Sequence, residues 1–126
     1  HLADRASILT GDLTGLPDDA FAALVADAAP DAVIHLAAQA NPQASRSNPR
    51  HTWDVNLLGT LALLEAVRRA GLRPRIVLIS TGVCYGNPAP DDMPVSERCP
   101  LRPLDPYSAS KAAADVLGIQ HHLEHG

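Results

Sequence analysis

The sequence lacks a long apolar run, since no stretch of its 126 residues approaches the roughly 20 apolar residues that span a bilayer. It also lacks a positively charged start followed by an apolar segment, so we expect neither a secretory signal nor a membrane partner. Its only cysteines, Cys84 and Cys99, fit neither metal-type spacing nor a disulfide framework. We therefore expect a cytoplasmic protein with reduced thiols.

Basic charge is also scarce. The 10 lysines and arginines are outnumbered by 14 acidic residues, and they are scattered instead of gathered into a stripe. Because nucleic-acid binding depends on neutralising phosphates, this distribution argues against a nucleic-acid partner. The chain has no internal repeat and no low-complexity tract, and its length corresponds to a single domain.

What the chain does contain is an alternation of strand-like and helix-like segments. Strand patterns cover 6–9, 31–39 and 75–80, and helix patterns cover 17–28, 52–70 and the segment from 105 onward. This alternation implies crossover connections, so we predict an α/β fold with a parallel sheet. The run "DAVIHLAAQ" favours a strand buried on both faces, whereas "NPQASRSNPR" is predicted to be a polar loop.

Polar and small residues follow each predicted strand. They are Asp12, then 35–41, then 80–85. Ligands of open parallel sheets bind beyond the carboxyl ends of the strands, so we expect a binding site at this edge.

The segment "LDPYSASKAAAD" predicts a helix that presents a phenol beside an ammonium. Asp105 suits the N-cap and Pro106 the first helical position, which puts Tyr107 and Lys111 four residues apart on one face. A stripe for burial is predicted from the apolar residues Ala109, Ala112, Ala113, Val116, Leu117 and Leu123.

A cation within about 4–6 Å favours the phenolate form of a tyrosine. Such a phenol is suited to exchange a proton with a sugar hydroxyl or carbonyl oxygen during hydride transfer. The same spacing also occurs in surface pairs without a role. Thr81, at the end of a predicted strand, offers a hydroxyl to a substrate oxygen or is a plain strand end.

Other candidates have two readings each. Asp12 suits either an adenine amino group or a cap on its own turn, and Asn56 is either a buried polar relay or an exposed helix residue. We expect His35 to be a buried histidine with a hydrogen-bond partner. His121 and His125 have metal-ligand spacing, but without a third ligand in the sequence pattern we predict a solvated helix end and no metal.

Taken together, "GDLTG", "PDAVIHLAAQ", "DVNLLGTLALLEAVRRAG", "VLISTGVCYG" and "PLRPLDPYSASKAAAD" resemble the extended short-chain dehydrogenase/reductase family. The resemblance is strongest to the GDP-6-deoxy-D-mannose reductase and GDP-mannose 4,6-dehydratase group. It implies that residues 1–126 form the central part of an NAD(P)-binding Rossmann-type domain, a doubly wound parallel sheet. The family's first two strands, glycine-rich loop and carboxyl-terminal substrate domain are not in the sequence, so we expect a fragment of a longer enzyme that binds dinucleotide poorly by itself.

The resemblance also implies residue roles. Tyr107 would be the acid/base, Lys111 would hold the nicotinamide ribose and favour the phenolate, and Thr81 would complete the catalytic set. The cofactor, NAD or NADP, would contact Asp12, Leu13, Leu36, Ala37, Ala38, Gln39, Asn56, Tyr107 and Lys111. The resemblance further implies a homodimer formed by the helix at 52–70 and the final helix.

Dehydratases of this family carry acidic residues just after the catalytic threonine, where this chain has Gly82 and Val83. We therefore expect reduction of a 4-keto-6-deoxy sugar nucleotide, GDP-linked, ahead of 4-epimerisation and then 4,6-dehydration. A cofactor-sensing regulatory module and an inactive fragment are the non-enzymatic alternatives. The retained Tyr107, Lys111 and Thr81 favour the enzyme.

Overall fold

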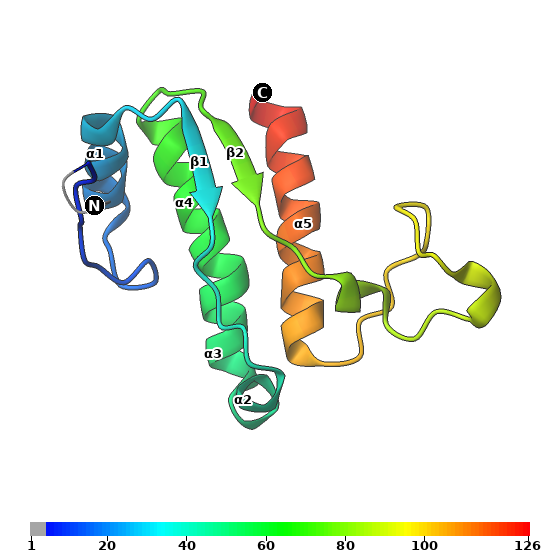
Figure 1. Ribbon diagram of the computed structural model, residues 1–126. Helices are drawn as coiled ribbons and strands as arrows, with labels where there is room; N and C mark the ends of the chain where they lie inside the picture. The colour runs from blue at the N-terminus through cyan, green and yellow to red at the C-terminus, as the bar shows by residue number, and fades with distance from the viewer. Residues whose placement is uncertain (1–4) are drawn as a thin grey trace.

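The computed structural model describes residues 5–126, which form two parallel strands and a set of helices (Figure 1). Strand β1 (Ala32–His35) pairs with β2 (Arg75–Leu78), and Ala32 lies opposite Arg75 in the register. The main helices are α1 (Asp18–Ala28), α2 (Pro42–Ser47), α3 (Pro49–Trp53), α4 (Gly59–Arg69) and α5 (Pro106–His125). A π-helical turn, η2 (Asp54–Leu58), joins α3 to α4, and two 3₁₀ turns, η3 (Gly82–Tyr85) and η4 (Pro90–Asp92), follow β2. The predicted α/β fold with a parallel sheet is confirmed.

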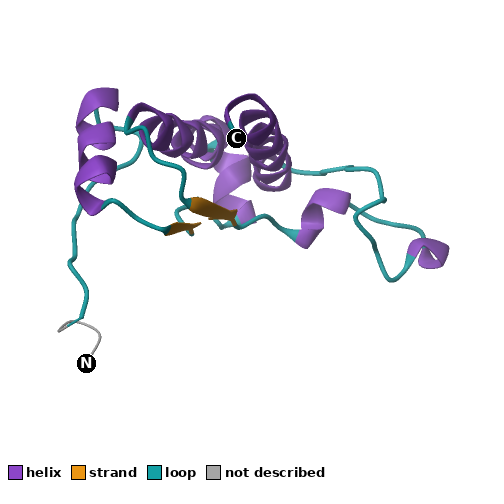
Figure 2. Cartoon of the chain, turned by 90° about the horizontal axis from the view of Figure 1, so that it is seen from above, coloured by secondary structure: helices purple, strands orange, loops and turns teal. Residues whose placement is uncertain are grey.

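Helices α4 and α5 lie on the same side of the two strands (Figure 2). The hydrophobic core forms where α1 packs on α4, and its buried side chains are Phe21, Val25, Leu63, Ala66 and Val67. Helix α4 ends at Arg69, and Gly71 follows with a φ of 69°, a left-handed conformation that suits glycine. The connection β1–α4–β2 is therefore a crossover unit with its helix packed on one face of the sheet.

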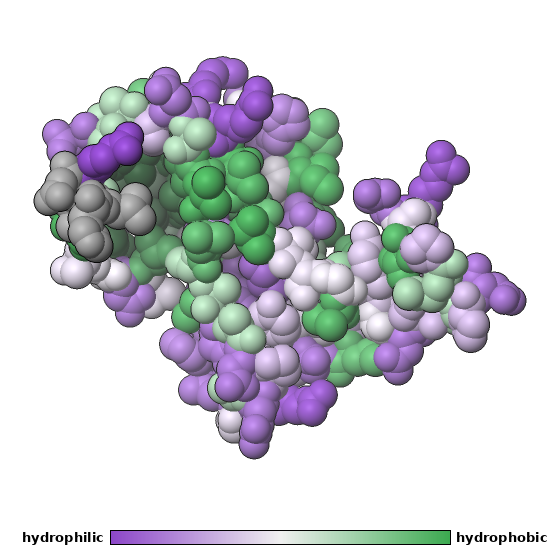
Figure 3. Space-filling model, viewed as in Figure 1, coloured by the Kyte–Doolittle hydropathy of each residue, from purple (hydrophilic) through white to green (hydrophobic). Residues whose placement is uncertain are grey.

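The opposite face of the sheet is open. Ile34 is 65% exposed, and Val77 and Ile79 are 43% and 44% exposed. A hydrophobic patch lies over the strands on this face (Figure 3). The expectation that residues 31–39 form a strand buried on both faces is thus wrong for this face, because within residues 5–126 helices pack against the other face.

The predicted strand at 6–9 does not form. Residues 6–10 have no regular secondary structure, and Ile8 and Leu9 are 78% and 74% exposed. A strand needs a hydrogen-bonded neighbour, and within the described residues the sheet consists of β1 and β2.

The segment 41–50, predicted as a loop, instead starts two helices. The Asn41 side chain accepts hydrogen bonds from the backbone N–H groups of Gln43 (2.9 Å) and Ala44 (3.1 Å), and Asn48 accepts one from His51 (3.2 Å). In both helices proline occupies the first turn, where its missing N–H has no cost. The long helix predicted from residue 52 therefore begins at Pro49.

Helix α5 begins as predicted. The Asp105 carboxylate accepts the Ser108 N–H (2.8 Å), and the Asp105 N–H donates to the Ser108 hydroxyl (3.2 Å), which forms a capping box. The predicted apolar stripe is only partly buried, because Val116 is 56% and Leu123 80% exposed while Ala112 is covered. Both cysteines are free thiols. None of the helices in residues 5–126 is long and apolar enough to cross a bilayer.

Candidate active site

The segments that follow β1 and β2 lie at the same edge of the sheet, where α5 begins (Figure 1). Helix α5 packs against η2, η3, α2 and α3. The predicted catalytic residues therefore come from neighbouring elements, since Thr81 directly precedes η3 and both Tyr107 and Lys111 lie in the first turns of α5. The predicted edge of the sheet is thus the place where these segments gather.

A single buried side chain, Asn56, connects three segments at this edge. Its Oδ1 accepts the Gln39 backbone N–H (2.7 Å), and its Nδ2 donates to the Gln39 carbonyl (3.1 Å) and to Ser110 Oγ (2.9 Å). Ser110 Oγ in turn donates to the Tyr107 carbonyl (2.8 Å). Asn56 is 1% exposed and Ser110 is fully buried. Of the two readings, the buried polar one is correct, and the amide fixes the segment after β1 relative to the start of α5.

Asn56 lies in the middle of the π-helical turn η2. The Thr60 hydroxyl donates to the Asn56 carbonyl (2.7 Å), which satisfies a backbone acceptor where the helix is irregular. Single π turns inside α-helices are found frequently at functional sites. Here the turn brings an asparagine, a poor helix former, into the packed interior.

His35 is buried and hydrogen-bonded, as expected. Its Nε2 lies 3.1 Å from Thr60 Oγ1. The Thr60 hydroxyl has one proton, and it donates this proton to the Asn56 carbonyl. Thr60 Oγ1 must therefore accept the hydrogen bond from His35, so the proton of neutral His35 lies on Nε2. Burial, followed by repulsion from Lys111, lowers the pKa of His35. His35 therefore helps to fix the Thr60 side chain, which in turn bonds the backbone of Asn56.

Lys111 is the most unusual charged group at this edge. It is only 7% exposed, and it forms no ion pair within residues 5–126. Burial lowers the pKa of Lys111, and attraction from Asp115 opposes this shift more weakly. Burying an ammonium costs free energy, and attraction from Asp115 offsets only part of that cost, so this site holds a cation without a directly paired carboxylate in residues 5–126.

Tyr107 is half-buried one helical turn before Lys111. Thr81 is also half-buried, in an extended conformation, and its side chain makes no capping bond to η3. The neighbouring Ser80 hydroxyl is buried without a hydrogen-bond partner. The carboxyl end of β2 thus supplies two adjacent hydroxyl groups.

The turn η3 is fixed against the segment that leads into α5. The Arg102 N–H donates to the Cys84 carbonyl (2.9 Å), and Cys84 is 4% exposed. Gly86 has a φ of 70°, and a Cβ at this position would overlap the Arg102 carbonyl oxygen. Backbone contacts therefore fix the position of the turn after Thr81 relative to the segment that leads into α5.

The predicted adenine contact lies elsewhere on the surface. Asp12 Oδ1 accepts the Thr14 N–H (2.9 Å) and the Thr14 hydroxyl (2.8 Å), and these bonds lower the pKa of exposed Asp12. The structure thus confirms the turn-capping reading, and a role in adenine binding stays a prediction. Among the other predicted cofactor residues, Leu36 and Ala37 are exposed, whereas Leu13, Ala38 and Gln39 are half-buried.

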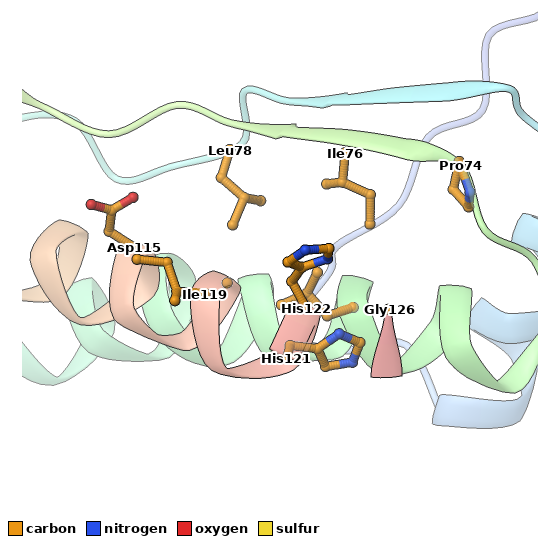
Figure 4. A pocket seen from close by; sticks show the side chains of 10 residues that line it. Pro74, Ile76, Leu78, Asp115, Ile119, His121, His122 and Gly126 are labelled. Atoms are coloured by element: carbon orange, nitrogen blue, oxygen red, sulfur yellow. The ribbon is translucent and has the colours of Figure 1, made fainter. Parts of the chain in front are cut away.

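A cleft of about 400 Å³ lies between β2 and α5 and runs along β2 from Pro74 to Leu78 (Figure 4). Ile76, Leu78 and Ile119 contribute to its lining, and none of the predicted catalytic residues does. This cleft adjoins the candidate active site at Asp115, the carboxylate that attracts Lys111.

Sequence reasoning missed three hydroxyl groups at the site. Ser110 bonds Asn56, Thr60 links Asn56 to His35, and Ser80 lies unpaired beside Thr81. One signal for Ser110 was available in the sequence. It is a serine within an alanine-rich helix, so its hydroxyl faces a buried surface and needs a hydrogen-bond partner.

The model of the GDP-mannose 4,6 dehydratase family matches residues 1–126, the entire chain. The chain belongs to this family. It thus lies within the extended short-chain dehydrogenase/reductase family of nucleotide-sugar epimerases, dehydratases and reductases, as the motifs indicated.

Two curated relatives of this family member have different activities. A UDP-glucose 4-epimerase of Streptomyces lividans is 44% identical over 96 residues, which are 76% of this chain and 28% of the relative. A GDP-6-deoxy-D-mannose reductase of Pseudomonas aeruginosa is 40% identical over 97 residues, 77% of this chain and 32% of the relative. The chain therefore spans about a third of the length of these relatives.

Solved structures of the family match the fold as well. RMD from Pseudomonas aeruginosa, complexed with NADPH, matches 94% of this chain and 39% of its own with a TM-score of 0.86 and 36% identity. The UDP-glucose 4-epimerase of Thermus thermophilus, in complex with NAD, matches 92% of this chain and 36% of its own with a TM-score of 0.81 and 34% identity. This family member is thus a partial Rossmann-type fold.

Proposed function

We propose that this chain supplies the catalytic residues of an NAD(P)-dependent oxidoreductase that reduces a 4-keto-6-deoxy sugar nucleotide, with GDP as the expected nucleotide. The observation that carries the proposal is the buried Lys111, which forms no ion pair within residues 5–126 and lies one helical turn after Tyr107. The similarity to a GDP-6-deoxy-D-mannose reductase and to a structure with bound NADPH supports it.

The residues present fit a nicotinamide cofactor. A buried ammonium that forms no ion pair within residues 5–126 is matched to the hydroxyl groups of a ribose and the nearby pyrophosphate charge, and the small Ala37 and Ala38 let a ligand approach the backbone after β1. When bound in its reduced form, the cofactor supplies a hydride to the carbonyl carbon of the sugar. Lys111, Ala37 and Ala38 would hold it, with Gln39 kept in place by Asn56.

Tyr107 and Thr81 then act on the carbonyl oxygen. As the C=O double bond becomes a C–O single bond, the oxygen takes the proton of the Tyr107 hydroxyl and a secondary alcohol results. Lys111 stabilises the phenolate left behind, which regains its proton from solvent. Thr81 donates a hydrogen bond to the same oxygen and orients it.

A 4-epimerase is the second candidate, because the relative at 44% identity is a UDP-glucose 4-epimerase. A 4,6-dehydratase is the third. It requires groups that move protons to and from the sugar during loss of water, and neither Gly82 nor the exposed Val83 can do so. The absence of acidic side chains at these two positions favours the reductase over the dehydratase.

We also propose that the longer protein is a homodimer formed by α4 and α5. Leu61 of α4 and Val116 of α5 are 37% and 56% exposed, and Leu58, the residue before α4, is 51% exposed. An apolar groove of about 500 Å³, lined by Leu57, Leu101, Pro103, Ala112, Ala113, Val116, Leu117 and Gln120, lies beside them. Pairing across a two-fold axis would remove these side chains from water.

The deciding assay follows NADPH oxidation by the longer protein with GDP-4-dehydro-6-deoxymannose as substrate. We expect turnover with this substrate and no interconversion of UDP-glucose and UDP-galactose. Epimerase activity without reduction would replace the reductase proposal with the second candidate.

The Tyr107→Phe variant tests the acid/base role. We expect its kcat to fall by about 10²–10⁴, because the proton donor is lost. Its affinity for NADPH should stay close to that of the unmodified protein, because Lys111 is retained. Turnover near the original rate would remove Tyr107 from the mechanism.

A further inference from the structure

A cluster of possible metal ligands lies on α4 and α5, far along α5 from Tyr107. Glu65 of α4 meets His121 and His125 of α5, and their ligand atoms all lie within 4.8 Å of one another. The two histidines are one helical turn apart on the same face. Glu65 Oε1 lies 3.6 Å from His121 Nε2. Helix packing thus supplies the third ligand that the sequence pattern alone did not show.

The His121 ring is oriented for a ligand that the protein does not provide. Its Nε2 is buried and has no hydrogen-bond partner, since 3.6 Å to Glu65 exceeds hydrogen-bonding distance. A buried ring nitrogen without a partner is therefore available to a ligand.

The carboxylate of Glu65 is held in place by Arg68. Arg68 Nε donates to both carboxylate oxygens (3.1 Å each), and its Nη2 donates to Oε2 (2.7 Å). These bonds keep the pKa of Glu65 below its ordinary value. Because each carboxylate oxygen has two lone pairs, Oε1 keeps one free toward His121. A hydrogen-bonded, ionised carboxylate is the usual form of a metal ligand, although the Arg68 charge weakens cation binding.

We propose that Glu65, His121 and His125 bind a divalent transition-metal ion of the zinc type. Two imidazoles and one carboxylate are a ligand set that zinc accepts, with water as the fourth ligand, whereas Ca²⁺ and Mg²⁺ prefer oxygen ligands alone. Zinc distances of about 2.0–2.2 Å place tetrahedral ligand atoms about 3.3–3.6 Å apart. The Glu65–His121 pair already has this spacing, and the His125 ligand atom lies within 4.8 Å of both.

The ion would join α4 to α5 and would not take part in the chemistry at Tyr107. One member of the cluster, His121, is among the residues that line the cleft between β2 and α5 (Figure 4). In this view the His121 ring lies on the side of α5 away from β2, whereas the adjacent His122 ring points toward β2. His122 is therefore a matched control, since it is the next residue on the same helix and lies outside the cluster.

The experiment titrates Zn²⁺ into the metal-free protein by calorimetry and records the visible spectrum of the Co²⁺ form. We expect one equivalent to bind, and the Co²⁺ spectrum to be that of a four-coordinate ion. Glu65→Gln, His121→Gln and His125→Gln should each weaken Zn²⁺ binding by at least about tenfold. His122→Gln should leave it unchanged.

Thermal unfolding with and without Zn²⁺ is the second measurement. An ion that binds only the folded protein raises its Tm, and this rise should disappear in His125→Gln. That side chain is at the end of α5, so its replacement leaves the fold intact. Wild-type protein that binds no Zn²⁺ at one equivalent, or an equal loss in His122→Gln, would show that these histidines form a solvated helix end.

Discussion

At the scale of single residues, the Asn56 side chain connects the most distant parts of the candidate site. It bonds both backbone groups of Gln39 after β1, and it bonds Ser110 on α5. An amide carries one acceptor and two donor hydrogens, and all three are used here. The orientation of α5 relative to the end of β1 thus depends on one buried group.

Asn56→Ala should lower the free energy of unfolding by about 2–4 kcal/mol, because the Gln39 backbone and the Ser110 hydroxyl lose their buried partner. Urea unfolding of the longer protein measures this loss. The exposed Asn87→Ala serves as the control and should change stability by less than about 0.5 kcal/mol. Equal effects at the two positions would contradict the role given to Asn56.

Lys111→Met should separate stability from function. The buried ammonium destabilises the folded protein, so the Tm of the methionine variant should equal or exceed that of the unmodified protein. NADPH affinity and turnover should both fall, because the proposed ribose contact is lost. A clear drop in Tm would indicate that Lys111 has a stabilising partner instead.

The same substitution has a defined pH dependence. The folded-state pKa of Lys111 lies below the ordinary lysine value, so the destabilisation is fully present below the folded-state pKa. It disappears as pH rises from that value to the ordinary one. The Tm advantage of Lys111→Met should therefore shrink in alkaline buffer, and thermal unfolding across this range measures the change.

At the scale of elements, the helix starts show what the sequence could predict. The Asp105–Pro106 pair predicted the beginning of α5, and the cap is present. The same chemistry at Asn41–Pro42 and Asn48–Pro49 starts α2 and α3, where the sequence pattern predicts a loop. The proline and asparagine content suggested a loop, but side-chain caps on the first N–H groups outweighed it. The π turn at Asn56 had no recognisable signal in the sequence.

The turn η3 can be tested through its glycines. Gly86→Ala should lower the free energy of unfolding by at least about 2 kcal/mol, because φ is positive and the added Cβ would meet the Arg102 carbonyl. Turnover should fall as well, since the turn positions Thr81. Gly82→Ala is the matched control: a Cβ there meets nothing within 4 Å. It should change the free energy of unfolding by no more than about 1 kcal/mol. Chemical unfolding measures this free energy for both variants, and equal losses would contradict the role given to Gly86.

At the scale of the whole molecule, the sheet has one covered face and one open face. The continuous apolar runs of β1 and β2 are typical of strands with helices on both sides, and this pattern correctly predicts a parallel sheet. Which face stays open depends on the helices present, and residue patterning alone does not show that. The Glu65–His121 contact was also beyond prediction, because it depends on how α4 packs against α5.

The open face predicts the behaviour of the 126 residues expressed alone. Ile34 and Val77 expose apolar surface there, so the chain should bind a hydrophobic dye such as ANS and associate as its concentration rises. The double variant Ile34→Thr, Val77→Thr should reduce both, because threonine keeps the β-branched shape. Dye fluorescence and light scattering measure the effect. Undiminished dye binding by the double variant would show that another surface is responsible.

The π turn at 54–58 also affects how relatives should be aligned. One residue corresponds to about 100° of rotation in a helix, so a regular α-helix here would turn Asn56 away from Gln39 unless the chain were one residue shorter. A one-residue gap in this segment of an alignment therefore marks a relative in which a regular α-helix can keep the amide facing Gln39, whereas a relative of equal length should retain the π turn.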